Sequence, residues 1–257
     1  MKTLLTLSDI QRIKELYIHT YEKHKLILND MILFQDTILS SSSHYRDVRA
    51  LDTPYGLNKD EYDINDNICG AWEYAFIIMN LPLEKGLTVL EAASSASILP
   101  AYLTNLGYNF ISVDLETSYQ EAIKKNINSD YQIIQADLKE IPVADNSVDV
   151  IISNSALEHI QDDIAMWKEF TRILKPSGKM IHTFPIAKPG YTNAWLQEPI
   201  DFFKNPTEIH NKTHRLIDKR IAEENYFLPN NLWVEIWEEH FYHREIQAFC
   251  VVKKNKQ

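Results

Sequence analysis

A run of small residues behind an acidic one is the part of this sequence best suited to hold a cofactor. The apolar run from Leu87 to Leu90 ends in Glu91, and only alanine and serine fill positions 92–97. Ala93, Ser95 and Ser97 stand at the alternate positions where a nucleotide-cofactor loop carries glycine. Small residues there let a ligand approach the backbone closely. We therefore expect a cofactor loop that is built without glycine.

Polar side chains also follow the next three apolar segments. Asp114 comes 23 residues after Glu91, where an acid commonly binds ribose hydroxyls in dinucleotide folds. Asp137 follows the third segment, and Asn154 with Ser155 follows the fourth. Ligands bind at the carboxyl ends of the strands in an open parallel sheet. We therefore expect these side chains to gather at one edge of such a sheet.

The elements that must position these residues alternate from residue 88 onward. Turn residues and apolar runs predict strands at 87–91, 110–114, 131–135, 148–153 and 179–184. Helices are expected between them at 98–106, 117–127 and 161–174, the last one ending in a turn at Lys175 to Gly178. Two final strands are predicted at 232–239 and 244–252. This order predicts an α/β fold, Rossmann-like and doubly wound, with a mostly parallel sheet.

The N-terminal part of the chain follows a helical pattern. Ser8 is a candidate N-cap for a first helix, and further helices are predicted at 26–39 and 70–81. We interpret residues 1–69 as helices and a loop that form a cap. Residues 70–257 would be the catalytic domain, with a substrate-facing insertion at about 185–230 after the fifth strand.

Five motifs occur in a fixed order along the predicted sheet. They are Ala136-Asp137-Leu138, Ile141-Pro142, Asp145-Asn146-Ser147-Val148-Asp149, Ala156-Leu157-Glu158-His159-Ile160 and Ile173-Leu174-Lys175-Pro176-Ser177-Gly178. This set resembles the class I S-adenosylmethionine-dependent methyltransferases, especially the small-molecule group. The resemblance covers about residues 70 to 185. It implies S-adenosylmethionine as the cofactor and methyl transfer as the reaction.

The resemblance also implies which residues hold the cofactor. Glu91 and the alanine and serine loop would face its methionine part, with Asp114 on the ribose hydroxyls. Asp137 would accept from the adenine amino group, and Asn154 with Ser155 would lie along the methyl-donor end. The full implied set is Glu91, Ala93, Ser95, Ser97, Asp114, Leu115, Asp137, Leu138, Asn154 and Ser155. The alternative for Asp114 and Asp137 is a role as strand-end caps or turn residues.

A histidine near the methyl-donor end is the candidate base. His159 follows the fourth strand, and a hydroxyl acceptor needs a base near its proton. The alternative is a helix-start histidine that binds the backbone. His182 lies inside the fifth strand, where a core histidine with a satisfied ring is the expected role.

The insertion supplies the candidate substrate-binding residues. These are Tyr191, Trp195, His210, His214 and Arg215. Basic groups there could bind a phosphate or carboxylate, and a solvated surface loop is the alternative. His210 and His214 are four residues apart, which is a spacing that suits a metal on a helix. No third ligand follows from the spacing, so we expect no metal.

Composition excludes several classes of partner. A formal net charge of −10 argues against nucleic acid, which needs a basic face. The two cysteines lie far apart, and no apolar run approaches the length that a bilayer requires. The start of the chain has no long apolar segment of a signal peptide. We expect a cytoplasmic protein with a small-molecule substrate and no membrane, and no pattern fixes its oligomeric state.

The sequence therefore predicts a methyltransferase that acts on a small polar metabolite, a sugar or a phosphorylated precursor, on oxygen or nitrogen. One alternative is a catalytically inactive relative that serves as a scaffold or partner subunit, because its loop lacks glycine. Another is a different nucleotide-binding enzyme such as a dehydrogenase, against which the motif around Asp137 argues.

Overall fold

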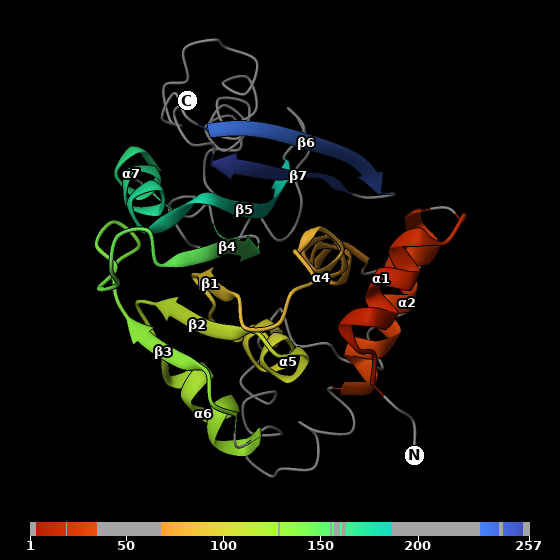
Figure 1. The fold of residues 1–257 in the computed structure, drawn as a ribbon, viewed down its shortest axis with the longest axis horizontal. Helices are drawn as coiled ribbons and strands as arrows, with labels where there is room; N and C mark the ends of the chain where they lie inside the picture. The colour runs from red at the N-terminus through yellow and green to blue at the C-terminus, as the bar shows by residue number, and fades with distance from the viewer. Residues whose placement is uncertain are drawn as a thin grey trace.

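A seven-stranded sheet forms the centre of the protein in the computed structural model (Figure 1). The structure describes residues 4–18, 20–34, 68–127, 129–154, 156, 160, 163–186, 232–241 and 244–253. The strand order is β3-β2-β1-β4-β5-β7-β6. The strands are β1 (Thr88–Ala92), β2 (Asn109–Asp114), β3 (Gln132–Gln135), β4 (Val148–Asn154), β5 (Leu174–Ile186), β6 (Leu232–Phe241) and β7 (Arg244–Lys253).

The first five strands are parallel, and β7 pairs antiparallel with both β5 and β6. The order in which strands are added to the sheet reverses between β1 and β4. From β1 the sheet extends through β2 to β3 on one side, and from β4 it extends to β5 on the other. Ligands bind at such a switch point in doubly wound sheets. The prediction of a mostly parallel, Rossmann-like sheet is confirmed.

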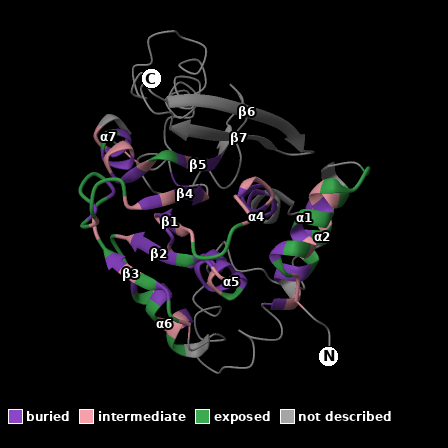
Figure 2. Ribbon diagram, in the orientation of Figure 1, coloured by how far each residue is buried: buried purple, intermediate pink, exposed green. Residues whose placement is uncertain are grey.

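The central strands are buried along most of their length (Figure 2), and their alternating side chains belong to two separate cores. Val89 of β1 belongs to one core and Leu90 to the other. The same alternation holds for Val150 and Ile151 of β4. Strands that are buried on both faces read as continuous apolar runs, which is why they stand out in the sequence.

Helices cover both faces of the sheet. The core on one face includes residues of α4 (Ile68–Asn80), α5 (Leu99–Leu106) and α6 (Ser118–Ile127), and α7 (Asp163–Ile173) covers the other face. Pro100 lies in the first turn of α5, where a missing N–H costs nothing. Gly107 ends α5 in the left-handed conformation.

The N-terminal helices are α1 (Leu7–Glu15) and α2 (Thr20–Phe34). The predicted N-cap at Ser8 is wrong, since Thr6 caps α1 in a reciprocal capping box with Asp9. The predicted start of the second helix at 26 is also too late. Asp30 of α2 accepts a hydrogen bond at 2.7 Å from the hydroxyl of Tyr102 in α5, which connects α2 to a helix that covers the sheet. The division into a cap and a domain stays a proposal, and its boundary falls inside α4.

The predicted turn at Lys175 to Gly178 is part of β5 instead. Val148 pairs with Leu174 and Val150 with Lys179, so the extra residues form a bulge beside β4. Gly178 is required there, because a Cβ would lie 2.7 Å from side-chain atoms of the buried Leu174. A bulge and a turn share the same residue types, and only the pairing distinguishes them.

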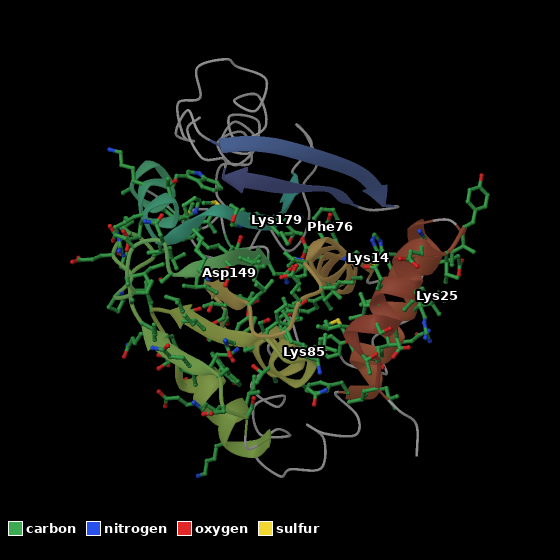
Figure 3. The ribbon with its side chains drawn as sticks, in the orientation of Figure 1. Lys14, Lys25, Phe76, Lys85, Asp149 and Lys179 are labelled. Atoms are coloured by element: carbon green, nitrogen blue, oxygen red, sulfur yellow. The ribbon has the colours of Figure 1, made fainter. Side chains whose placement is uncertain are left out.

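Two lysines bind the end of α4 (Figure 3). Lys14 donates to the carbonyl of Leu81 at 2.9 Å, and Lys179 donates to that of Asn80 at 3.3 Å. Cations are favoured at a helix C-terminus. Burial, followed by the charge of Lys179, lowers the pKa of Lys14 to about 8.

None of the helices among the described residues combines the length and apolar character needed to cross a membrane.

Candidate functional site

Glu91 lies at the carboxyl end of β1 with its side chain enclosed by protein. Only 1% of the residue is exposed. The side chain of Ser97 forms a hydrogen bond with it, while Oε2 has no hydrogen-bond partner among the described residues. A buried polar atom without a partner is costly. Glu91 therefore offers an acceptor, or a proton, to a ligand at this end of the strand.

Ionisation of Glu91 should make the free protein less stable at higher pH. Burial raises the pKa of Glu91 to about 8 from an ordinary value of 4.5. The folded protein therefore holds this proton more tightly than the unfolded chain does. The resulting stability is fully present below pH 4.5 and is lost as the pH rises toward 8. Glu91→Gln cannot ionise, so it should flatten this decline.

Urea unfolding at a series of pH values from about 5 to 8 measures this effect. Glu116→Gln is the control, because Glu116 is exposed and its pKa is lowered, which places its titration below this window. An unchanged slope in the Glu91→Gln protein would mean that Glu91 is already ionised in the free protein.

The loop after β1 keeps a glycine-like backbone at two of the three predicted positions. Ala93 has a φ of 54° and Ser95 a φ of 38°. Such values are uncommon for residues other than glycine. Ser97 does not share this conformation, and its Oγ accepts from the Leu99 N–H at 3.2 Å at the start of α5. Only Ala93 and Ser95 of these three residues therefore have a glycine-like backbone, and the assignment of all three to the cofactor stays a prediction.

Asp114 ends β2 directly beside this loop. Its Oδ2 accepts from the Ser95 N–H at 2.8 Å, and its Oδ1 accepts from the Glu116 N–H at 3.1 Å. A carboxylate offers about four acceptor positions, so further acceptor capacity remains for a ligand. Both the turn role and the ligand role considered from the sequence are compatible with this geometry. Asp114 links the β1 loop to the β2 loop.

The residue after Asp114 is a large apolar side chain left in solvent. Leu115 is 67% exposed, more than any other leucine among the described residues. Gln135 at the end of β3 donates to the Leu115 carbonyl at 2.8 Å. An exposed leucine at the carboxyl edge of the sheet is well placed to contact a flat ring.

Asp137 lies in the segment after β3. Its side chain is about half exposed, its Oδ1 accepts from the Lys139 N–H at 2.9 Å, and Oδ2 lies 3.3 Å from the Lys139 ammonium. The side chain of Leu138 points into the α7-side core, which leaves only its backbone for a ligand. The structure thus places Asp137 and Leu138 on the strand edge that also carries Asp114.

The end of β4 supplies Asn154 and a buried pair behind it. Asn154 Oδ1 accepts from the Thr183 hydroxyl at 2.9 Å. His182 Nδ1 lies 2.7 Å from Ser153 Oγ, and the ring contacts Trp167 and Phe170. Burial lowers the pKa of His182 to about 3, so its ring stays neutral near pH 7. His182 is a core residue, as the sequence suggested.

The remaining candidates fall outside the described residues. These are Ser155, His159, Tyr191, Trp195, His210, His214 and Arg215. Their sequence-based roles stay predictions. Among the described residues, no three His, Cys, Asp or Glu side chains group as metal ligands.

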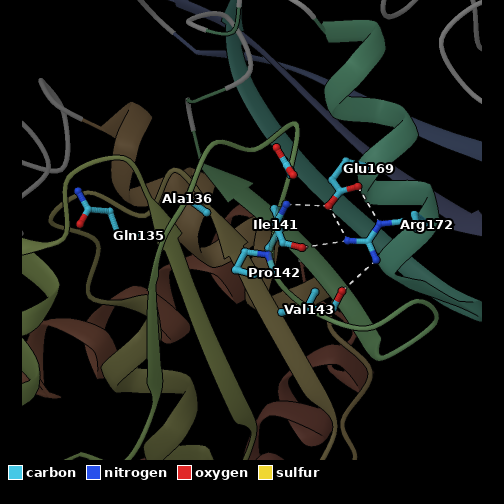
Figure 4. Close-up of a pocket in the computed structure, with 8 residues that line it drawn as sticks. Gln135, Ala136, Ile141, Pro142, Val143, Glu169 and Arg172 are labelled. Carbon is cyan, nitrogen blue, oxygen red and sulfur yellow. Dashed lines mark hydrogen bonds and ion pairs between the residues drawn. The ribbon is translucent and has the colours of Figure 1, made fainter.

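Sequence reasoning missed two polar groups, one at this edge and one near the start of β4. Gln120 of α6 donates to the carbonyls of Ser95 and Ser97, and no sequence pattern marks a lone helical glutamine. Arg172 of α7 binds Glu169 and two carbonyls of the segment after β3 (Figure 4), and it also binds Asp145. A pocket of about 570 Å³ lies here, and Glu169 and Arg172 in its wall already bind each other.

A family model described as a methyltransferase domain matches residues 90–182. This range runs from the end of β1 through β5 and includes the Glu91 loop, Asp114 and Asp137. It starts one residue before Glu91.

Two curated relatives match part of this chain. A probable S-adenosylmethionine-dependent methyltransferase of Mycobacterium tuberculosis is 30% identical over 100 residues, which are 38% of this chain and 35% of that protein. Phosphoethanolamine N-methyltransferase 1 of Arabidopsis thaliana is 36% identical over 96 residues, 37% of this chain and 18% of the plant protein. The chain thus spans about a third or less of the length of these two relatives.

A solved structure shares the fold. It is phosphoethanolamine N-methyltransferase 2 of Haemonchus contortus in complex with S-adenosyl-L-methionine, with a TM-score of 0.56 and 16% identity. The match covers 86% of this chain and 59% of the other. The family match and the shared fold confirm the resemblance drawn from the five motifs, with S-adenosylmethionine as the cofactor.

Proposed function

Since residues 90–182 form a class I S-adenosylmethionine-dependent methyltransferase domain, we propose that the protein methylates the nitrogen of a small polar amine. A phosphorylated amine is the first acceptor to test. The observation that carries this choice is the 36% identity with a plant phosphoethanolamine N-methyltransferase. A hydroxyl of a sugar or of a phosphorylated precursor is the second candidate acceptor.

The residues of the carboxyl edge fit the cofactor. Glu91 has a buried carboxyl oxygen without a hydrogen-bond partner among the described residues, which suits a ligand that donates a hydrogen bond, such as an ammonium group. Asp114 keeps acceptor capacity for two ribose hydroxyls, and the exposed Leu115 offers an apolar surface to adenine. We assign Asp137 and the Leu138 backbone to the adenine edge, and Asn154 with Ser155 to the methyl-donor end.

The loop geometry supports an active enzyme over the scaffold alternative. Ala93 and Ser95 keep positive φ values that non-glycine residues avoid in the absence of a reason. Such strained residues persist where the surrounding structure fixes them, and they are frequent at ligand sites. The loop therefore contains no glycine, but Ala93 and Ser95 adopt the positive φ values that are typical of glycine.

When bound, S-adenosylmethionine supplies a methyl group on a positively charged sulfur. The protein's part is to hold the acceptor in line with that group and to keep water away. His182 is packed in the core and burial lowers its pKa to about 3, so its ring is a weak proton acceptor and a poor choice for the base. An amine needs only to arrive unprotonated, while a hydroxyl acceptor would use His159 as its base.

The acceptor site is assigned from the sequence. Tyr191 and Trp195 would enclose an amine by cation–π contact. Arg215, with His210 and His214, would bind a phosphate or carboxylate at the other end of the acceptor.

Incubation of the purified protein with methyl-labelled S-adenosylmethionine tests the proposal. The acceptors are phosphoethanolamine, ethanolamine, dimethylglycine and a phosphorylated sugar, and mass spectrometry detects the added methyl. We expect transfer to the phosphorylated amine at a rate at least tenfold above that to ethanolamine. Transfer to the sugar alone would overturn N-methylation. Binding of the cofactor without methyl transfer to these acceptors, or to any metabolite of a cell extract, would favour the scaffold alternative.

A further inference from the structure

The strained loop of residues 93–97 is held from the side of α6. Gln120 is fully buried, and its Nε2 donates to the Ser95 carbonyl at 2.8 Å and to the Ser97 carbonyl at 2.9 Å. Both N–H groups of one amide are thus used, on two carbonyls of the same loop. These bonds flank Ala96 and fix the backbone on either side of it.

Tyr131 fixes the orientation of this amide. Its hydroxyl lies 3.0 Å from both Oε1 and the backbone carbonyl oxygen of Gln120. Because the hydroxyl donates to Oε1, the amide nitrogen is the atom left to face the loop. Burial raises the pKa of Tyr131, so the hydroxyl stays protonated and remains a donor.

A third contact holds the other side of the loop. The Ser95 N–H donates to Asp114, while its carbonyl accepts from Gln120. The peptide groups on both sides of this residue are therefore tied, and its φ of 38° is imposed from two directions. A glycine would adopt this φ without such restraint.

We propose that Gln120, oriented by Tyr131, is a positioning residue that holds the loop of residues 93–97 in the conformation that binds S-adenosylmethionine. It performs the task that glycine performs in loops of this kind. The inference rests on the proposed assignment of this loop to the cofactor.

Gln120→Leu removes both hydrogen bonds at nearly constant volume. We expect its Kd for S-adenosylmethionine to rise at least tenfold, while kcat at saturating cofactor stays within twofold. Tyr131→Phe leaves the amide in place but unoriented, so its Kd should rise about threefold. Titration calorimetry gives Kd, and initial rates give the separate effects on KM and kcat.

Ser95→Gly provides a rescue that a merely structural role would not give. Glycine accepts a positive φ at no steric cost. The double variant Gln120→Leu with Ser95→Gly should recover at least threefold in Kd over Gln120→Leu. This recovery should exceed any change in Kd that Ser95→Gly alone causes in the otherwise unaltered protein.

Ile123→Ala is the matched control for lost stability, because Ile123 is buried on the same helix and its apolar side chain forms no hydrogen bond with the loop. It should lower the unfolding temperature without raising Kd. Hydrogen exchange of the free protein adds a readout that needs no cofactor. The amides of Ser94, Ser95 and Ser97 donate hydrogen bonds, and they should exchange faster in Gln120→Leu than in Ile123→Ala.

Two results would overturn the positioning role. One is exchange of these amides at equal rates in Gln120→Leu and Ile123→Ala, and the other is an equal rise in Kd in both. The wild-type protein could also fail to bind S-adenosylmethionine, while hydrogen exchange of the loop is faster in Gln120→Leu as expected. That result would remove the assignment of the loop to the cofactor, but it would still show that Gln120 holds the loop.

Discussion

Asp114→Ala is expected to weaken the binding of S-adenosylmethionine about 100-fold. Hydrogen bonds to a charged group contribute about 1.5–3 kcal/mol each. On the proposed assignment the substitution removes the acceptor of the ribose hydroxyls, and it also removes the acceptor of the Ser95 N–H in the loop after β1. Two such losses correspond to about 3 kcal/mol or more, and each 1.4 kcal/mol is about tenfold in Kd.

Two control variants separate these contributions. Asp114→Asn keeps the shape and one acceptor oxygen, so its Kd should rise about tenfold. Glu116→Ala removes an exposed carboxylate two residues away and should leave Kd within about twofold, because surface charges are screened. Titration calorimetry with S-adenosylmethionine and with its demethylated product measures all three. Unchanged affinity in Asp114→Ala would remove this residue from the cofactor site.

The residues at the strand ends could be predicted because the pattern that reveals a strand also locates its end. The apolar run of β2 stops at Asp114, and parallel strands end at one edge of the sheet. Each position then followed from chain order alone. The same reasoning placed His182 in the core, where it packs against Trp167 and Phe170.

Contacts between distant segments could not be predicted in this way. Gln120 lies 25 residues from Ser95 in sequence, and its spacing on α6 shows no link to the loop. Local signals also competed at the ends of elements. Ser8 and Thr6 are both suitable N-caps, and Asp9 decides between them by reaching back to Thr6.

The bulge in β5 illustrates a third limit. Pro176, Ser177 and Gly178 are typical of a turn after a helix, yet they belong to a strand paired with β4. The close approach of Gly178 to Leu174 is a tertiary contact that no local pattern shows. These residue types therefore indicated an irregular backbone correctly, but they did not show whether it was a turn or a bulge.

Arg172→Ala is expected to reduce the free energy of unfolding by about 2–3 kcal/mol. The guanidinium donates to Glu169 and to the carbonyls of Ile141 and Val143 (Figure 4), and it also donates to Asp145. Its removal leaves the Glu169 side chain, which is 10% exposed, without its cation. Breaking a fully buried pair costs about 3–5 kcal/mol, and the partial exposure of Arg172 reduces that figure.

Asp145→Ala is the matched control. Asp145 is the exposed partner of the same arginine, with a side chain that is 69% exposed, so its loss should cost less than about 1 kcal/mol. Urea unfolding monitored by circular dichroism measures both variants. Equal destabilisation of the two proteins would show that the ion pair with Glu169 contributes no more than the surface pair.

The pH dependence supplies a second test of the same network. Hydrogen bonds from Arg172 hold the pKa of Glu169 below its ordinary value of 4.5. The stability that this pairing provides is therefore present above pH 4.5 and is lost as the pH falls through the lowered pKa of the folded state. The difference between the wild type and Arg172→Ala should narrow on acidification below this pH. A constant difference down to about pH 3 would mean that the carbonyl contacts, which do not titrate, carry the whole effect.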